Sequence, residues 1–132
     1  MNHRILLADD NEKLRRALTH ILEESGYSVV GVATGTEALR LLNASSEFDL
    51  LITDLVMPDM DGQELLTELK CTDSSLPVIA MSGSFSGRLL RVATTFGVAT
   101  IGKPFRRSSL LNLVESALSS SHQAQLSSLF TS

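Results

Sequence analysis

Side chains that could take part in phosphoryl chemistry follow four separate apolar runs of the chain. They are Asp9 and Asp10, then Asp54, Ser82 and Lys103. Carboxylates can act as nucleophiles and as ligands of a hard cation, and a lysine ammonium can neutralise a phosphoryl oxygen. Each group alone has an ordinary explanation, because such residues are common in turns, in helix caps and in solvent. Their repetition after four apolar runs favours phosphoryl transfer, which needs a nucleophile, a metal and a positive charge.

The apolar runs before these residues have the length and composition of buried strands. We expect strands at 4–8, 27–32, 50–54, 77–81 and 98–101. Pro58, which lacks an N–H, stops further strand pairing soon after Asp54. Parallel strands place their carboxyl ends at one edge of a sheet, where ligands bind in open α/β folds. The candidate residues are therefore expected to share one site.

Helical patterns fill the intervals between the strands. Asn11 and the Thr34-x-x-Glu37 capping box predict helix starts, and Gly26 predicts a helix end. Apolar residues at helical spacing predict helices near 11–26, 34–43, 61–69, 85–96 and 110–118. This alternation predicts the α/β class, as a doubly wound five-stranded parallel sheet with five helices on its two faces.

Composition limits the function classes that fit the chain. The 132 residues carry a net charge of −4, which argues against direct nucleic-acid binding. Residues 74–114 hold no acid but five bases, which favours an anion or an acidic partner for this segment. The single Cys71, the absence of a long apolar run and the absence of a signal-peptide pattern lead us to expect a cytoplasmic protein with no membrane partner. We expect one folded domain, 1–119, and a flexible Ser-rich tail, 120–132.

Four motifs give the chain a specific resemblance over residues 4 to about 119. They are Leu7-Ala8-Asp9-Asp10-Asn11, Asp54-Leu55-Val56-Met57-Pro58-Asp59-Met60-Asp61-Gly62, Met81-Ser82-Gly83 and Lys103-Pro104-Phe105. In this order and spacing they resemble the receiver domain of two-component response regulators, including the chemotaxis regulators. The resemblance implies a flavodoxin-like fold with strand order 2-1-3-4-5.

The resemblance also implies roles for the site residues. Asp54 would accept a phosphoryl group from the phospho-His of a sensor histidine kinase or a phosphotransfer protein. The Mg²⁺ cofactor, for which Mn²⁺ can substitute, would be held by the carboxylates of Asp9, Asp10 and Asp54 and by the backbone carbonyl of Val56. Lys103 would pair with the phosphoryl group, and the Lys103–Pro104 peptide would be cis.

The expected signal passes from the phosphoryl group to a partner surface. Ser82 would move to bond the phosphoryl group, and the small Gly83 would leave it reachable through its backbone. The change would reach the face made by the fourth helix, fifth strand and fifth helix, which would regulate a protein effector or form a self-dimer. One departure is Thr100, which stands where receivers commonly have an aromatic switch residue. The usual coupling of a hydroxyl residue to that aromatic cannot operate here as written.

Other readings stay open beside a free-standing receiver. The chain could be the receiver portion of a longer DNA-binding response regulator or of a hybrid histidine kinase. It could also be a pseudo-receiver that never uses phosphate. This alternative stays open because Thr100 replaces the usual aromatic switch residue. A haloacid-dehalogenase-type phosphatase needs a second Asp two residues after its nucleophile, where this chain has Val56. We therefore expect that the chain is not an enzyme and that it catalyses only its own phosphorylation and dephosphorylation.

Overall fold

Five parallel strands form one sheet, in the order β2-β1-β3-β4-β5. The computed structural model describes residues 3–45, 47–57, 59–60, 62–71, 75–83, 91 and 94–130, of which 62–63, 71 and 120–130 are described by their backbone alone. The strands are β1 (Arg4–Ala8), β2 (Ser28–Val32), β3 (Leu50–Asp54), β4 (Val78–Ser82) and β5 (Ala99–Gly102). The predicted fold class and strand order are confirmed.

The three inner strands form the buried centre of the sheet. All residues of β3 and β4 are buried, and so are four of the five residues of β1. Strands covered on both faces read as continuous apolar runs, which is why their sequences lack strand-like alternation. The edge strands β2 and β5 are mostly half-buried.

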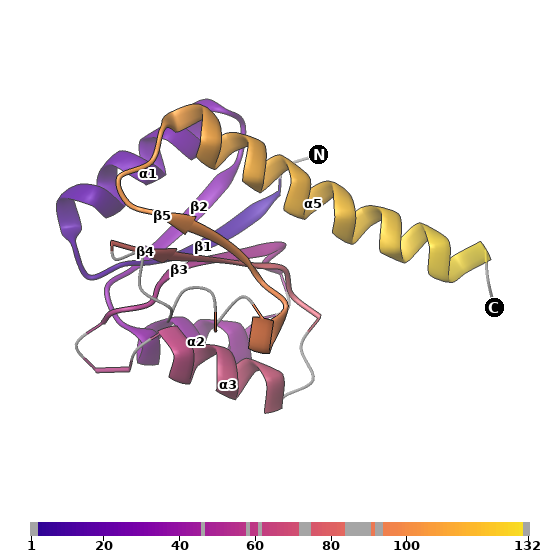
Figure 1. Cartoon of the computed structure of the whole chain (residues 1–132), viewed down its shortest axis with the longest axis horizontal. Helices are drawn as coiled ribbons and strands as arrows, with labels where there is room; N and C mark the ends of the chain where they lie inside the picture. Colours follow the sequence, from indigo (N-terminus) through magenta and orange to yellow (C-terminus); the bar gives the residue numbers. More distant parts are fainter. Residues whose placement is uncertain are drawn as a thin grey trace.

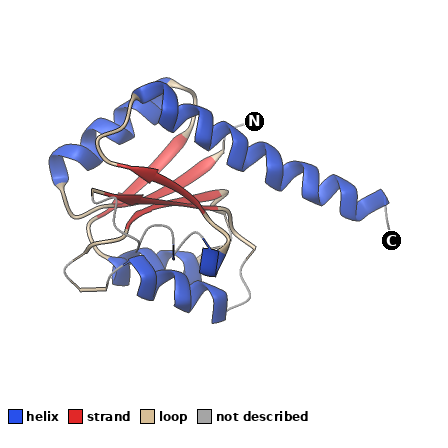
Figure 2. Cartoon of the chain, viewed as in Figure 1, coloured by secondary structure: helices blue, strands red, loops and turns tan. Residues whose placement is uncertain are grey.

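Helices cover both faces of the sheet, as Figures 1 and 2 show. α1 (Glu12–Glu24) and α5 (Arg107–Phe130) lie on one face, and α2 (Gly35–Ala44) and α3 (Gly62–Cys71) lie on the other. Two core clusters match these layers. One joins Leu18 of α1 and Leu110 of α5 to the sheet, and the other joins Ala38 of α2 and Leu65 of α3 to it.

The predicted caps start two of these helices. The Asn11 side chain accepts a hydrogen bond from the Leu14 N–H at 3.1 Å, and Thr34 Oγ1 accepts one from the Glu37 N–H at 3.1 Å. Both helices therefore begin at the residues that the sequence marked. Gly26, with φ +96°, follows α1 in a conformation that favours glycine.

Two predicted segments need a separate account. The fourth predicted helix, 85–96, lies mostly outside the described residues. Within this range, residues 91 and 94–96 are described, and they are helical. Residues 120–130 of the predicted tail are helical and continue α5 to Phe130, and Figure 1 shows this end extending away from the sheet. The flexibility of the tail stays a prediction. The run 119–130 contains no Gly or Pro, so nothing in it stops a helix that packed turns have started. The domain boundary at residue 119 stays a prediction.

Candidate functional site

The carboxyl ends of β1, β3, β4 and β5 bring the candidate residues together. Asp9 follows β1, Asp54 ends β3, Ser82 ends β4 and Lys103 follows β5. The sheet register sets Asp54 beside Met81 and Ser82 beside Gly102. The Lys103 N–H donates to the Ser82 carbonyl at 2.7 Å, which extends the β4–β5 pairing into the site. Residues up to 94 positions apart thus meet at one sheet edge.

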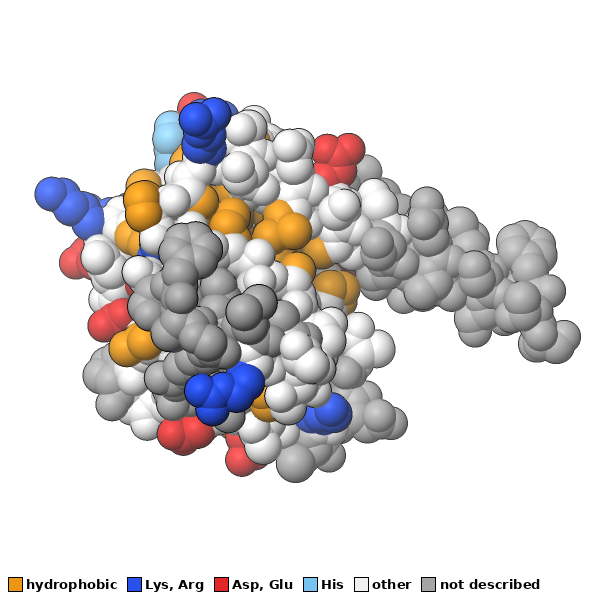
Figure 3. All heavy atoms as spheres, viewed as in Figure 1, with side chains coloured by type: hydrophobic (Ala, Val, Ile, Leu, Met, Phe, Trp, Pro, Cys, Tyr) orange, Lys and Arg blue, Asp and Glu red, His pale blue; other side chains and the backbone are white. Residues whose placement is uncertain are grey.

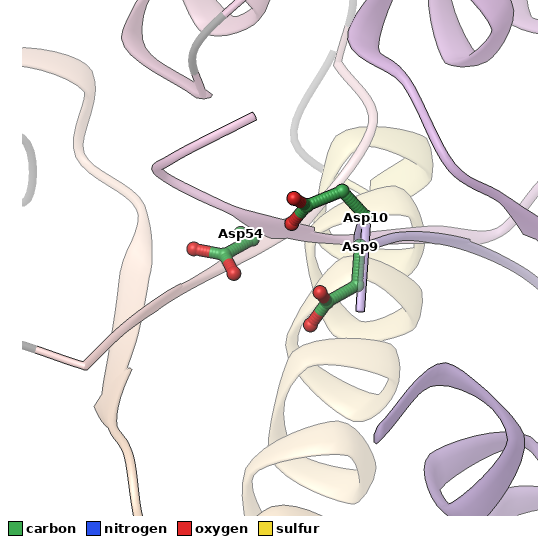
Figure 4. A group of neighbouring side chains, drawn as sticks. All are labelled: Asp9, Asp10 and Asp54. Carbon is green, nitrogen blue, oxygen red and sulfur yellow. The ribbon is translucent and has the colours of Figure 1, made fainter. Parts of the chain in front are cut away.

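Three carboxylates form an acidic cluster at this edge. Asp9, Asp10 and Asp54 each have a carboxylate oxygen within 4.8 Å of the others. Figure 4 shows Asp9 and Asp10 leaving the end of β1 beside Asp54 from β3. Asp9 and Asp54 are buried, whereas Asp10 is exposed, so solvent reaches the cluster from one side.

The Lys103 ammonium lies against two of these carboxylates. Its Nζ is 2.6 Å from Asp54 Oδ2 and 3.1 Å from Asp9 Oδ2. Burial acts to lower the pKa of Lys103, but hydrogen bonds to Asp54 and Asp9 outweigh it, and the pKa is raised. Three carboxylates and one ammonium sum to −3 + 1 = −2, the charge that one divalent cation balances.

The donors of the cluster fit a hard divalent cation. They are all oxygens, which Mg²⁺ and Mn²⁺ prefer over softer metals. The exposed Asp10 leaves room for the waters that Mg²⁺ usually keeps. Asp9, Asp10 and Asp54 would therefore hold such an ion.

Backbone groups around the cluster orient the acids. The Asn11 N–H donates to Asp9 Oδ1 at 2.9 Å, and the Val56 N–H donates to Asp54 Oδ1 at 3.1 Å. Each of these acids thus has one oxygen fixed by the backbone and the other directed to Lys103.

The remaining predicted site residues surround this core. Ser82 is buried, Gly83 is exposed, and Val56 is the large apolar side chain with the highest exposure in the described chain, at 63%. Thr100 is half-buried on β5, opposite Ala80 of β4. The Lys103–Pro104 peptide is cis, the geometry that the resemblance implies. Pro58 and Asp61 of the second motif lie outside the described residues.

Two residues near the site did not stand out in the sequence. Arg15 of α1 donates from Nη1 to the Asp9 carbonyl at 2.7 Å. Asp59, a residue of the second motif to which no role was assigned, accepts hydrogen bonds from the Gly35 and Thr36 N–H groups at the start of α2. Their partners are backbone groups of other elements, so no local pattern could have marked them.

Comparison with known proteins decides the family. The family described as the response regulator receiver domain matches residues 5–115. The chain belongs to this family. Phosphorylation and Mg²⁺ binding are typical of receiver domains. The match is to this family and not to the haloacid-dehalogenase-type phosphatases considered as an alternative.

Individual relatives show in what settings such receiver domains occur. The chain is 36% identical to the response regulator receiver protein CpdR of Brucella abortus, over 87% of this chain and 96% of CpdR. It is also 36% identical to the transcriptional regulatory protein GlrR of Escherichia coli, over 94% of this chain but only 29% of GlrR. The signal receiver domain of an HD domain-containing protein from Pseudomonas fluorescens superposes with a TM-score of 0.85, at 30% identity, over 93% of this chain and 99% of that one.

Within the described part of the chain, every helix is too short or too polar to cross a bilayer.

Proposed function

We propose that this receiver domain accepts a phosphoryl group on Asp54 from the phospho-His of a histidine kinase or phosphotransfer protein. The observation that carries this proposal is the contact of Lys103 with Asp54 and Asp9 inside the acidic cluster. This contact supports the proposal because phosphoryl transfer needs a nucleophile, a cation site and a positive charge, and a carboxylate, several oxygen ligands and an ammonium lie close together here.

The transfer exchanges one bond to phosphorus for another. A carboxylate oxygen of Asp54 attacks the phosphorus, the bond from phosphorus to the donor's imidazole nitrogen breaks, and its electron pair stays on that nitrogen. Mg²⁺, when held by Asp9, Asp10, Asp54 and the Val56 carbonyl, supplies charge neutralisation for the phosphoryl oxygens. The Lys103 ammonium, already at the Asp54 carboxylate, is placed to hold another of these oxygens.

The output of the domain is proposed to be a protein contact. Ser82 would bond the phosphoryl group, and the change would reach the surface of the fourth helix, β5 and α5. Arg91 and Arg106 are exposed, and Figure 3 shows Lys and Arg side chains at the surface of the face that it draws. Such positive charge suits an acidic partner or a second copy of the domain. Charge reversal at Arg91 or Arg106 is expected to weaken that contact without changing phosphorylation of Asp54. Unchanged partner binding would reject this surface.

The domain is further proposed to act within a larger signalling system in the cytoplasm. It turns over no free substrate beyond its own phosphorylation and dephosphorylation. It could work as a free-standing receiver or within a longer DNA-binding regulator, since its similarity covers 96% of the receiver protein CpdR and 29% of the transcriptional regulatory protein GlrR. A hybrid histidine kinase is a third setting.

Intact mass after incubation with acetyl phosphate and Mg²⁺ tests the proposal directly. The native chain is expected to gain the mass of one phosphoryl group, and Asp54→Ala is expected to gain none. Asp49→Ala is a matched control, because Asp49 is an exposed acid just before β3 whose carboxylate accepts a hydrogen bond from the Arg4 N–H at 2.8 Å. No gain in the native chain would support the pseudo-receiver instead. A beryllofluoride complex would then report whether residues around Thr100 move.

A further inference from the structure

Arg15 turns from α1 back toward the end of β1. Its Nη1 donates to the Asp9 carbonyl at 2.7 Å, and the side chain is half-buried. The next residue, Arg16, behaves as a helical arginine usually does: it is exposed and pairs with Glu12 one turn earlier, at 3.1 Å. Ordering the long Arg15 side chain against a neutral carbonyl costs conformational entropy. We therefore looked for a role of this hydrogen bond in the arrangement of Asp9.

Gly31 of β2 opens the path that Arg15 follows. A Cβ built on Gly31 would lie 3.2 Å from Arg15 Cδ and 3.3 Å from Arg15 Cγ. The Arg15 stem therefore lies directly over the backbone of the edge strand. The φ angle of Gly31 is not in the left-handed region, so a larger residue there would disturb the Arg15 side chain more than the local backbone.

Three hydrogen bonds therefore hold Asp9, one at its backbone N–H, one at its carbonyl and one at its carboxylate. Its N–H donates to the Val32 carbonyl at 3.1 Å, its carbonyl accepts from Arg15, and its Oδ1 accepts from the Asn11 N–H. The Asp9 side chain is fully buried, which leaves Oδ2 as the atom directed to Lys103 and the acidic cluster. A small rotation of this peptide would move Oδ2 relative to Asp54.

We propose that Arg15, on the path opened by Gly31, is a positioning residue that sets the Asp9 carboxylate for the divalent cation. The inference rests on the proposed function, since it assigns a role toward the same Mg²⁺ site. It extends that function to a residue of α1 whose hydrogen bond goes to the backbone carbonyl of Asp9.

The sign of the change in Mg²⁺ affinity separates positioning from simple charge. Arg15→Met removes a positive charge near the acids, so electrostatics alone predicts tighter Mg²⁺ binding. Loss of positioning predicts weaker binding. Gly31→Ala shifts the Arg15 stem by a few tenths of an ångström without removing a charge, so for this variant only loss of positioning predicts weaker binding.

The test measures Mg²⁺ binding by calorimetry on the full chain, without a phosphodonor. We expect Arg15→Met to weaken binding about tenfold, as is common for residues that support metal ligands, and Arg15→Lys to restore part of the loss. Gly31→Ala should weaken binding in the same direction. Arg16→Met, a matched loss of charge one residue away, should leave the affinity within about twofold. Amide NMR shifts of Asp9 and Asp10 in the metal-free chain should move with Arg15→Met and Gly31→Ala and stay in place with Arg16→Met.

The outcomes also separate this inference from the proposed function. If the native chain binds no Mg²⁺, the function itself is rejected together with this inference. If the native chain binds Mg²⁺ and both Arg15→Met and Gly31→Ala bind it equally well or more tightly, only the positioning role is rejected. Gly31→Ala decides the matter alone if Arg15→Met does not fold.

Discussion

Lys103 Nζ lies 2.6 Å from Asp54 Oδ2, so an ammonium from the end of β5 rests on the acid at the end of β3. These strands are not neighbours, because β4 runs between them. The contact thus ties together two strands that share no backbone hydrogen bonds. A group added to Asp54 would have to share or replace this contact, which gives β5 a direct connection to the state of the acid.

Replacing Lys103 is expected to change Mg²⁺ affinity and phosphorylation in opposite directions. Lys103→Met changes the summed charge of the site from −2 to −3, so Mg²⁺ should bind more tightly by on the order of 1 kcal/mol after solvent screening. Phosphorylation of Asp54 by acetyl phosphate should slow, because the phosphoryl oxygens lose a positive partner. Calorimetry and intact mass measure the two effects. Lys103→Arg keeps the charge and should bind Mg²⁺ like the native chain. Weaker Mg²⁺ binding by Lys103→Met would contradict this account of the charges.

Asp59 is expected to give the fold a stability that depends on pH. Hydrogen bonding by Thr36, followed by weaker contributions that include the Gly35 N–H, lowers the pKa of Asp59 below its ordinary 3.8. A depressed pKa in the folded state stabilises the fold above 3.8 and loses that effect as the pH falls through the lower, folded-state pKa. Asp59→Asn should therefore unfold at lower urea concentration than the native chain at neutral pH. The difference between the urea concentrations at which Asp59→Asn and the native chain unfold should narrow well below pH 3.8. A difference that does not change with pH would contradict the stabilising role of the lowered Asp59 pKa.

Gly35 is expected to tolerate no side chain. A Cβ there would lie 2.9 Å from both Cβ and the carbonyl oxygen of Met60, and that oxygen belongs to the backbone. Gly35→Ala should destabilise the fold by about 1–3 kcal/mol in urea unfolding, as overpacking of a close contact does. Gly83→Ala is the control, since a Cβ at Gly83 would meet nothing within 4 Å. Equal stability of the two variants would rule out the close contact between α2 and the segment after β3.

Truncation tests the predicted domain boundary. Leu118 is the last residue of α5 described as buried, at 8% exposure. Removal of residues 120–132 should leave the free energy of unfolding within about 0.5 kcal/mol of the full chain. Leu110→Ala, at a fully buried position of the same helix, should cost about 2–5 kcal/mol and serves as the comparison. A truncation that costs as much as Leu110→Ala would place residues 120–132 inside the domain.

The sequence allowed the sheet and the central acids to be predicted, because both depend on local patterns. Apolar runs mark the strands, and polar residues such as Asp54 and Lys103 directly follow them. Asn11 and Thr34 likewise cap helices through partners only three residues away. By contrast, Asp59 reaches N–H groups 24 and 23 residues earlier in the chain, and only the folded structure brings them together.

The length of α5 could not be predicted for a different physical reason. Apolar residues at helical spacing mark this helix only to Leu118, whereas it continues to Phe130. Helix growth adds one hydrogen bond for each residue fixed and is far easier than nucleation, so a packed segment such as the one around Leu110 can extend a helix into a weakly helical sequence. Composition alone does not report what precedes a segment.

The position of the Lys103 amine gives this domain a counterion that is tethered to its own chain. A tethered charge has an effective concentration set by the fold and not by the solution, so dilution or chelation cannot remove it. The buried Asp9 and Asp54 are therefore neutralised in part whether or not an ion is bound. Dissolved monovalent salts have little to add at such a site, whereas a divalent ion still finds a net charge of −2 to balance.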